Sequence, residues 1–217
     1  MEDRKFKTIL VTGGAGFIGS SFIHYMVKKY SEYNIINLDK LTYAGNLENL
    51  KSIEDKPNYK FIKGDIADTK IVGEIFSNGK IDAVVNFAAE SHVDRSIDDP
   101  GVFIQTDVFG TFVLLEAVKN HKTKLFFQIS TDEVYGSILN GSFKESDPLL
   151  PNSPYSASKA GAEMLVRSFY KTYKTPVVIT RTSNNFGPFQ FPEKIIPLFV
   201  TNLIDDIKFL FMVMGLM

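Results

Sequence analysis

The sequence predicts an α/β fold in which a doubly wound parallel sheet carries helices on both faces. Short apolar runs that suit buried strands alternate with longer segments of helical periodicity along the chain, as such a sheet requires. A glycine-rich turn, TGGAGFIG at residues 12–19, joins the first strand to the first helix. The second strand ends at an acidic residue, Asp39, about 20 positions after the first glycines.

The first half of the chain contains three further strands after the glycine turn. The apolar run Ile9 to Val11 is the first strand, and Asp68 is placed to cap a helix. In order, we expect a helix over 17–30, a strand over 34–38, a helix over 46–53, a strand over 59–63, a helix over 68–76 and a strand over 81–87.

The second half continues the alternation. Pro100 stands in the first turn of a long predicted helix, where proline is tolerated. The expected elements are a helix over 100–120, a strand over 125–129, a polar loop over 141–154, a helix over 156–173, a strand over 177–180, an irregular segment over 184–192 and a helix over 193–204.

Composition excludes several classes of protein. The 24 Lys and Arg residues balance 25 Asp and Glu residues without a basic block, so nothing predicts binding to nucleic acid or to a membrane surface. The absence of cysteine rules out disulfides and thiolate metal sites, and three histidines predict no metal centre. No signal peptide and no apolar run of membrane-spanning length are recognised. We therefore expect a soluble, cytoplasmic protein of one α/β domain.

The glycine turn predicts dinucleotide binding. Residues without side chains let backbone N–H groups approach a pyrophosphate, which the positive end of the following helix also attracts. The acidic side chain of Asp39 suits the hydroxyls of an adenosine ribose. The alternative is a tight turn with a purely structural role.

Tyr155 and Lys159, at the start of the helix predicted over 156–173, have the spacing of one helical turn, which places them on one face. A lysine ammonium close to a tyrosine lowers the pKa of the phenol, which can then remove a hydroxyl proton while hydride leaves the same carbon for NAD. The Tyr-x-x-x-Lys spacing also occurs by chance in many helices. After a dinucleotide fold and a strand that ends in Ser130-Thr131, the spacing indicates a dehydrogenase-type pair.

Six segments together resemble the extended short-chain dehydrogenase/reductases, and within them the dTDP-glucose 4,6-dehydratases. They are TGGAGFIG, NLDKLTYAGN, FAAESHVDRSI, STDEVYG, SPYSASKAGAE and SNNFGPFQFPEKIIP, and they extend to about residue 204. The resemblance implies a Rossmann-like NAD-binding domain over 1–192, followed over 193–217 by the start of a small substrate-binding region that is largely missing. It also implies dTDP-glucose as substrate and a homodimer through helices 100–120 and 156–173.

The resemblance further implies individual binding residues. Those expected to contact NAD are Gly13, Gly16, Phe17, Ile18, Gly19, Asp39, Lys40, Leu41, Thr42, Asp65, Ile66, Ala88, Ala89, Ser91, Thr106, Tyr155, Lys159 and Asn185. Those expected to contact the sugar nucleotide are Ser91, Thr131, Asn184, Glu193 and Lys194. His92 is expected to be a packing or hydrogen-bonding residue of its loop.

Asp132 and Glu133 decide the class of reaction. Oxidation at C4 of glucose makes the C5 proton acidic, so a base can remove it while an acid expels the C6 hydroxyl and hydride returns to C6. The resemblance implies that Glu133 is the base, that Asp132 is the acid and that Thr131 binds the hydroxyl being oxidised. Adjacent carboxyls in different environments can hold the different protonation states that these roles require. The alternative is that the two carboxyls stand exposed at a strand end and have no catalytic role.

Three alternatives for the function remain open. A UDP-glucose 4,6-dehydratase carries much the same motifs, and a nucleotide-sugar 4-epimerase of the same superfamily needs no acid and base pair for elimination. The third alternative is an inactive NAD-binding remnant. The last residues, FLFMVMGLM, stand where the resemblance expects FPLYGDGLNVRDW. We therefore expect residues 210–217 to be out-of-frame sequence after the loss of one nucleotide, in a truncated and poorly soluble chain with impaired activity.

Overall fold

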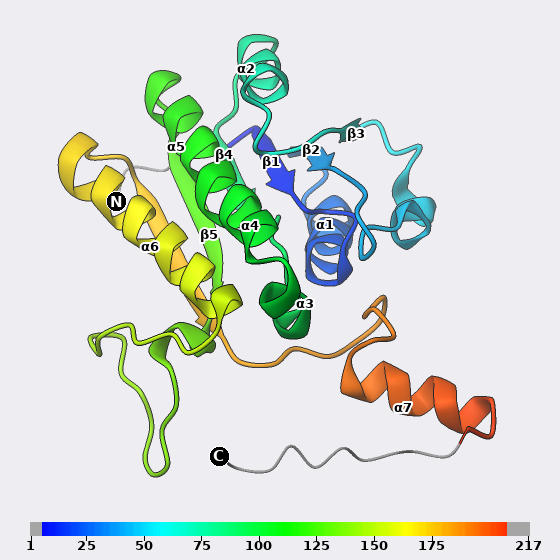
Figure 1. Ribbon diagram of the computed structural model, residues 1–217. Coiled ribbons are helices and arrows are strands. Elements are labelled where there is room, and N and C mark those ends of the chain that lie inside the picture. The colour runs from blue at the N-terminus through cyan, green and yellow to red at the C-terminus, as the bar shows by residue number, and fades with distance from the viewer. Residues whose placement is uncertain (1–5, 208–217) are drawn as a thin grey trace.

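The computed structural model describes residues 6–207, which form the predicted doubly wound sheet (Figure 1). All six strands are parallel, in the order β3-β2-β1-β4-β5-β6. They are β1 (Thr8–Thr12), β2 (Asn34–Asp39), β3 (Tyr59–Lys63), β4 (Ala83–Asn86), β5 (Leu125–Thr131) and β6 (Val177–Thr182). Strand order reverses between β1 and β4, so a ligand crevice is expected at the carboxyl ends of these strands.

The helices follow the predicted order, with two additions. They are α1 (Phe17–Lys29), η1 (Leu47–Ile53), α2 (Thr69–Ser77), α3 (Val93–Asp98), α4 (Pro100–Phe103), η2 (Ile104–Gly110), α5 (Thr111–Asn120), η3 (Asp132–Tyr135), α6 (Pro154–Tyr173) and α7 (Ile195–Ile204). The short helices α3 and η3 were not predicted, and η1 is a 3₁₀ helix. The expectation for residues 210–217 lies outside the described residues.

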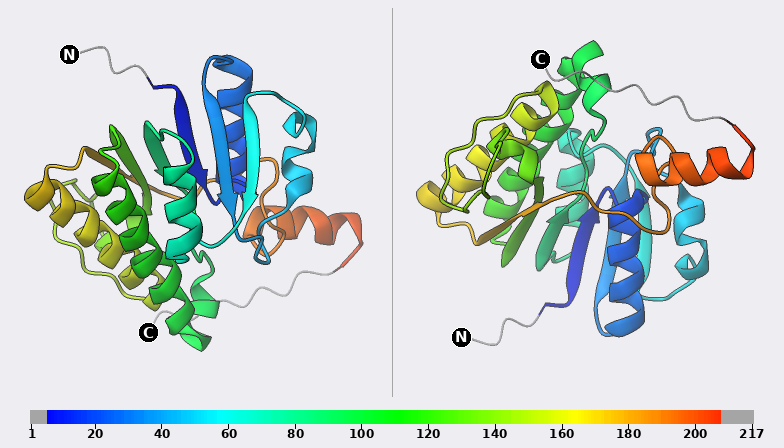
Figure 2. Two further views of the ribbon diagram at one scale, coloured as in Figure 1. Left: turned by 90° about the horizontal axis from the view of Figure 1, so that it is seen from above. Right: turned by 90° about the horizontal axis from the view of Figure 1, so that it is seen from below.

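Strand alternation divides the core between the two faces of the sheet. Leu10 and Phe126 point to the face covered by α2, α5 and α6, whereas Ile9 and Val11 point to the face covered by α1 and η1. Figure 2 shows these helices on opposite sides of the sheet. The period of two in β1 therefore serves two cores at once, as buried parallel strands do.

The expectation that the chain has no apolar run of membrane-spanning length is wrong for the helix over Pro100–Asn120. By length and composition it could cross a membrane, because an 18-residue window has a mean hydropathy of 1.5. In the fold 44% of that window is buried, and α5 packs on α6 and α2. Helices in the core of soluble proteins can have the same length and the same hydropathy. Its middle segment, η2, is π-helical, a distortion that is frequent near functional sites.

Asp82 connects the amino ends of β1, β4 and β5, at the end of the sheet opposite the crevice. Its Oδ2 accepts hydrogen bonds from the N–H groups of Lys7 (2.9 Å) and Thr8 (3.2 Å), which lead into β1. The Nζ of Lys124, just before β5, lies 3.0 Å from Oδ1. Burial alone would raise the pKa of this carboxyl, but the hydrogen bonds and the lysine charge outweigh burial and lower it.

The first prediction concerns this carboxylate. Because its pKa is lower in the folded state, its stabilising contribution is present above about pH 4 and is lost as the pH falls through the folded pKa. We expect Asp82→Asn to lower the free energy of unfolding at pH 7 by roughly 1–3 kcal/mol. Urea unfolding at pH 7 and near pH 3 measures this, and the difference from wild type should shrink at the acid pH. An equal difference at both values would contradict the prediction.

Candidate active site

The glycine turn between β1 and α1 is packed too closely for any side chain at several positions. Gly13 has a left-handed backbone (φ +67°), and a Cβ there would lie 2.6 Å from the backbone nitrogen of Ala88. A Cβ on Gly19 would lie 2.3 Å from the carbonyl oxygen of Gly13. The Gly14 N–H donates to Asn37 Oδ1 (3.1 Å), which ties the turn to β2. The glycines therefore bring three strand ends and a helix into backbone contact.

The amino end of α1 is open toward this crevice. Its N-cap is Gly16, which offers no side chain to the first N–H groups, and the first turn carries no acidic residue. A Cβ at Gly16 would meet only the Gly13 carbonyl oxygen, at 3.4 Å. Uncapped N–H groups at the positive end of a helix bind phosphate well.

Asp39 stands at the end of β2 and is 8% exposed. Its carboxylate accepts hydrogen bonds from the backbone N–H groups of Ala15 (2.9 Å) and Leu41 (2.8 Å). Burial raises the pKa of this carboxyl, and the two hydrogen bonds oppose the rise. The neighbouring Lys40 forms an ion pair with Asp65 (2.7 Å).

A cavity of about 340 Å³ extends from the glycine turn to α6. It brings together the predicted site residues except Leu41 and Asp132. Those lining it are Gly13, Gly16, Phe17, Ile18, Gly19, Asp39, Lys40, Thr42, Asp65, Ile66, Ala88, Ala89, Ser91, Thr106, Thr131, Glu133, Tyr155, Lys159, Asn184, Asn185, Glu193 and Lys194. Leu41 donates its backbone N–H to Asp39 and packs against the core on the α1 side of the sheet, and Asp132 is exposed beside the cavity.

The cavity also contains residues that sequence reasoning missed. Ser130 is the most informative, because its hydroxyl is buried and has no hydrogen-bond partner within the described residues. The others are Leu38, Ala44, Gly45, Gly64, Phe87, Glu90, Val93, Ile129, Thr182, Ser183, Gln190 and Phe191. Five of these, Leu38, Gly64, Phe87, Glu90 and Ser183, are next to a predicted residue in the sequence, so their neighbours could have identified them.

Tyr155 and Lys159 enter the site from the first turns of α6. A capping box between Ser153 and Ser156 begins the helix. Lys159 is buried, and its Nζ donates to the Ile129 carbonyl (2.8 Å). Burial raises the pKa of Tyr155, as do the charges of Glu133 and other carboxylates, whereas a hydrogen bond with Thr131 lowers it.

The expected acidification of Tyr155 by Lys159 is therefore wrong for the described structure. The ammonium is directed at a backbone carbonyl, while burial and nearby carboxylates act on the phenol. Burial also lowers the pKa of Lys159, against the opposing charges of Asp107 and Glu163.

Asp107, from the π-helical segment η2, is a buried carboxyl whose charge acts on Lys159. It is 2% exposed and accepts hydrogen bonds from Ser158 Oγ (2.6 Å) and the Glu90 backbone N–H (3.0 Å). Burial raises its pKa, and the charge of Lys159 opposes that rise. Asp107 and Lys159 are thus both buried and close enough for the charge of each to oppose the effect of burial on the pKa of the other.

The carboxyls of Asp132 and Glu133 lie on η3, directly after β5. Thr131 Oγ1 caps this turn by accepting from the Glu133 N–H (3.2 Å) and donates to Asp132 Oδ1 (3.3 Å). Glu133 lines the cavity, whereas Asp132 does not. Burial, reinforced by the charge of Asp132, raises the pKa of Glu133, and the charge of Lys194 opposes the rise.

The segment after β6 crosses the carboxyl ends of the strands and reaches the loop after β2 (Figure 1). Glu193 accepts a hydrogen bond from the Tyr43 hydroxyl (3.3 Å) and lies near His92 (3.6 Å) and Arg95 (3.8 Å). Lys194 Nζ donates to the Ser91 carbonyl (3.2 Å). This segment therefore forms one wall of the cavity.

His92 has the hydrogen-bonding role expected of it. Its Nδ1 accepts from the Arg95 N–H (3.5 Å), which caps α3. Within residues 6–207 no group of three or more His, Cys, Asp or Glu side chains is arranged to hold a metal ion.

Comparison with known proteins identifies a family. Residues 10–211 match the family described as GDP-mannose 4,6 dehydratase. A dTDP-glucose 4,6-dehydratase of Streptomyces antibioticus is 52% identical over 205 residues, which are 92% of this chain and 60% of that protein. The chain spans about 60% of the length of the curated relatives it matches.

Two solved structures place the fold among sugar-nucleotide enzymes. The dTDP-glucose 4,6-dehydratase of Bacillus anthracis in complex with NAD is 53% identical, with a TM-score of 0.85 over 92% of this chain and 62% of that one. The UDP-glucose 4-epimerase of Thermotoga maritima with UDP-glucose is 30% identical, also with a TM-score of 0.85, over 93% of this chain and 64% of that one.

The second prediction separates two glycines of the turn. Gly13→Ala should cost about 1–3 kcal/mol or more in the free energy of unfolding, because it combines a left-handed backbone with a collision at Ala88. Gly16→Ala should change stability by roughly 0.5 kcal/mol or less, since its backbone is extended and its Cβ has room. Urea unfolding of both variants tests this, and equal losses would contradict it.

Proposed function

The chain belongs to the GDP-mannose 4,6-dehydratase family, and from this membership we propose that it acts as an NAD-dependent dTDP-glucose 4,6-dehydratase. The proposed reaction converts dTDP-glucose to dTDP-4-keto-6-deoxyglucose and water. The observation that carries the proposal is one cavity that joins a phosphate-binding glycine turn to Thr131, Glu133, Tyr155 and Lys159.

The cofactor end of the cavity fits NAD. The uncapped amino end of α1 suits a pyrophosphate, and Asp39 suits the two hydroxyls of the adenosine ribose. We assign residues 1–192 to this cofactor domain and the chain from 193 onward to a substrate-binding region. The chemistry that NAD⁺ supplies when bound is uptake of hydride from C4, return of that hydride to C6, and a positive charge beside the reacting sugar.

In the proposed first step, the ionised hydroxyl of Tyr155 accepts the proton of the C4 hydroxyl as the C4 hydride departs. Burial and the neighbouring carboxylates disfavour that ionised form in the protein alone. The hydrogen bond with Thr131 favours it, and the positive charge of the bound cofactor would do the same. Thr131 also offers its hydroxyl to the C4 oxygen.

In the proposed elimination, Glu133 removes the C5 proton and Asp132 protonates the departing C6 hydroxyl, which leaves as water. Glu133 then returns its proton to C5 as hydride reaches C6. The proton held by Tyr155 passes through solvent to restore Asp132, so the substrate loses one water overall. The raised pKa of Glu133 makes its ionised form a stronger base, and of the two carboxyls only Glu133 lines the cavity.

The proposed molecule is a soluble, cytoplasmic homodimer. Apolar side chains remain exposed along the helix over Pro100–Asn120 and on α6, among them Ile104 (53%), Phe112 (38%) and Met164 (48%). The two helices pack side by side, so these side chains form a surface that a second copy can bury.

The third prediction tests the reaction. The purified chain, incubated with NAD⁺ and dTDP-glucose, should release a 4-keto-6-deoxy sugar nucleotide at an impaired rate, identified by chromatography and NMR. Asp132→Asn and Glu133→Gln should each slow elimination by about 10²–10⁴-fold while reduced cofactor accumulates, because oxidation at C4 precedes elimination. Tyr155→Phe should instead prevent the formation of reduced cofactor.

Three outcomes of this assay would contradict the proposal. Formation of dTDP-galactose would identify an epimerase, and turnover of UDP-glucose in preference to dTDP-glucose would assign the other nucleotide. Binding of NAD without any product would identify an inactive cofactor-binding remnant.

The fourth prediction concerns cofactor choice. NAD should bind at least about tenfold more tightly than NADP, because a 2′-phosphate would meet the charge of Asp39. The charge of Lys40 is engaged by Asp65, so Lys40→Ala should leave the preference nearly unchanged, whereas Asp39→Ala should reduce it. Isothermal calorimetry with both cofactors measures these affinities, and equal affinities in the wild-type chain would contradict the prediction.

A further inference from the structure

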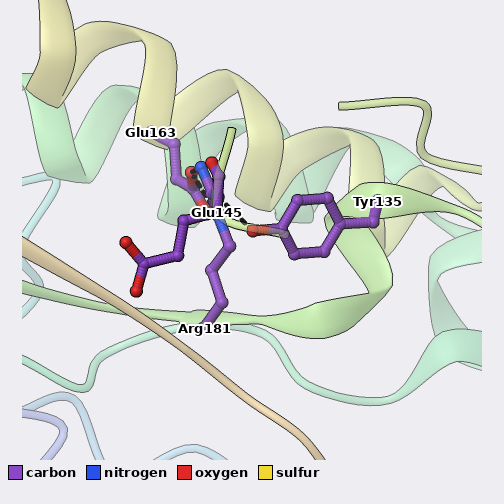
Figure 3. Close-up of polar contacts among 4 residues, drawn as sticks. All are labelled: Tyr135, Glu145, Glu163 and Arg181. Atoms are coloured by element: carbon purple, nitrogen blue, oxygen red, sulfur yellow. Dashed lines mark hydrogen bonds and ion pairs between the residues drawn. The ribbon is translucent and has the colours of Figure 1, made fainter. Parts of the chain in front are cut away.

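Arg181, on β6, lies at the centre of a polar network outside the cavity (Figure 3). Its Nε donates to both carboxylate oxygens of Glu163 (3.1 and 3.0 Å), and its Nη2 donates to Oε2 (2.6 Å). Its Nη1 donates to the Tyr135 hydroxyl and to the Glu145 carbonyl oxygen (3.3 Å). One guanidinium thus connects β6, α6, the end of η3 and the loop that precedes α6.

The pairing with Glu163 fixes the guanidinium in place. The Glu163 side chain is 1% exposed, and a buried carboxylate needs a hydrogen-bonded partner. A forked contact at two oxygens sets the orientation of the guanidinium as well as its distance. Hydrogen bonding to Glu163 raises the pKa of Arg181 further, so its charge is constant.

The other side of the network holds the turn that carries Asp132 and Glu133. Tyr135 is the last residue of η3 and is 7% exposed. Its ring stacks on Phe143 (centroids 4.9 Å apart), and the Arg181 guanidinium lies 4.7 Å from its centroid. The turn is therefore held by Thr131 at its start and by Arg181 at its end.

Glu163 belongs to the helix that carries the proposed hydroxyl base. Tyr155, Lys159 and Glu163 are spaced four residues apart, so they follow one face of α6. A change in the position of this face would move all three side chains together. Arg181 connects that face to Tyr135 at the end of η3.

We propose that Arg181 is a positioning residue that holds the Asp132–Glu133 turn in register with Tyr155 and Lys159. This inference rests on the proposed function, because the alignment matters only if the two pairs act on one substrate in successive steps. Displacement by about 1 Å can cost on the order of 100-fold in rate. The network therefore supports elimination at C5 and C6 rather than oxidation at C4.

The fifth prediction uses Tyr135→Phe, which removes one hydroxyl and leaves the buried ion pair intact. Replacement of Arg181 itself would leave the Glu163 carboxylate unpaired and could unfold the chain. The matched control is Tyr25→Phe on the surface of α1, where the phenol also accepts a hydrogen bond from a cation, Lys29 (2.6 Å), which lies over its ring (4.9 Å).

Two measurements on the full chain decide the question. By hydrogen–deuterium exchange, Tyr135→Phe should speed exchange across 132–136 by roughly tenfold without changing exchange across 156–173. In single turnover with NAD⁺ and dTDP-glucose, it should slow release of the 4-keto-6-deoxy product by about tenfold or more. Formation of reduced cofactor, followed by its near-ultraviolet absorbance, should stay within about twofold of wild type. Tyr25→Phe should change none of these rates.

Unchanged exchange across 132–136 would overturn the inference, as would equal slowing of reduced-cofactor formation and product release. A wild-type chain that forms no product would contradict the proposed function instead, and the exchange experiment would still decide whether Arg181 holds the turn.

Discussion

Close backbone packing at the glycine turn sets the distances between β1, β2, β4 and α1 at the carboxyl end of the sheet. Gly13 fits between β2 and β4 because it has no side chain. A Cβ there would collide with the backbone of Ala88. The same turn starts α1, leaves its amino end uncapped at Gly16 and brings Asp39 within hydrogen-bonding distance of Ala15. A parallel sheet whose order reverses at β1 opens a crevice at this point, and the glycines determine how closely a ligand can approach the backbone.

Burial dominates the electrostatics of the site. It is the largest influence on the pKa of Tyr155, Lys159, Asp107 and Glu133, and it disfavours the charged form of each. The charges of Asp107 and Lys159 have opposite signs, so each opposes the effect of burial on the pKa of the other. The π-helical segment η2 places Asp107 against Ser158 on α6. The distorted helix therefore contacts α6 next to Lys159.

The segment after β6 completes the cavity from a distant part of the sequence. Phe189 stacks on His24 of α1 (centroids 5.7 Å apart), and Phe191 packs on Tyr43. Glu193 then contacts Tyr43 in the loop after β2 and His92 and Arg95 at the start of α3. The sheet supplies the floor of the site, and this segment supplies a wall that is held by side-chain contacts.

The alternation of strands and helices, the glycine turn and 22 of the 35 residues that line the cavity were recognised from the sequence. These features are local or periodic, so Gly13, Asp39 and Tyr155 could be recognised in one dimension. The sequence did not determine that Asp132 stands outside the cavity, that Lys159 points to the Ile129 carbonyl or that Glu163 pairs with Arg181. Those outcomes depend on how elements far apart in the chain pack and on which charges burial isolates. They follow from the packing of the folded chain, because the free energy of a buried charge is set by partners that sequence spacing does not reveal.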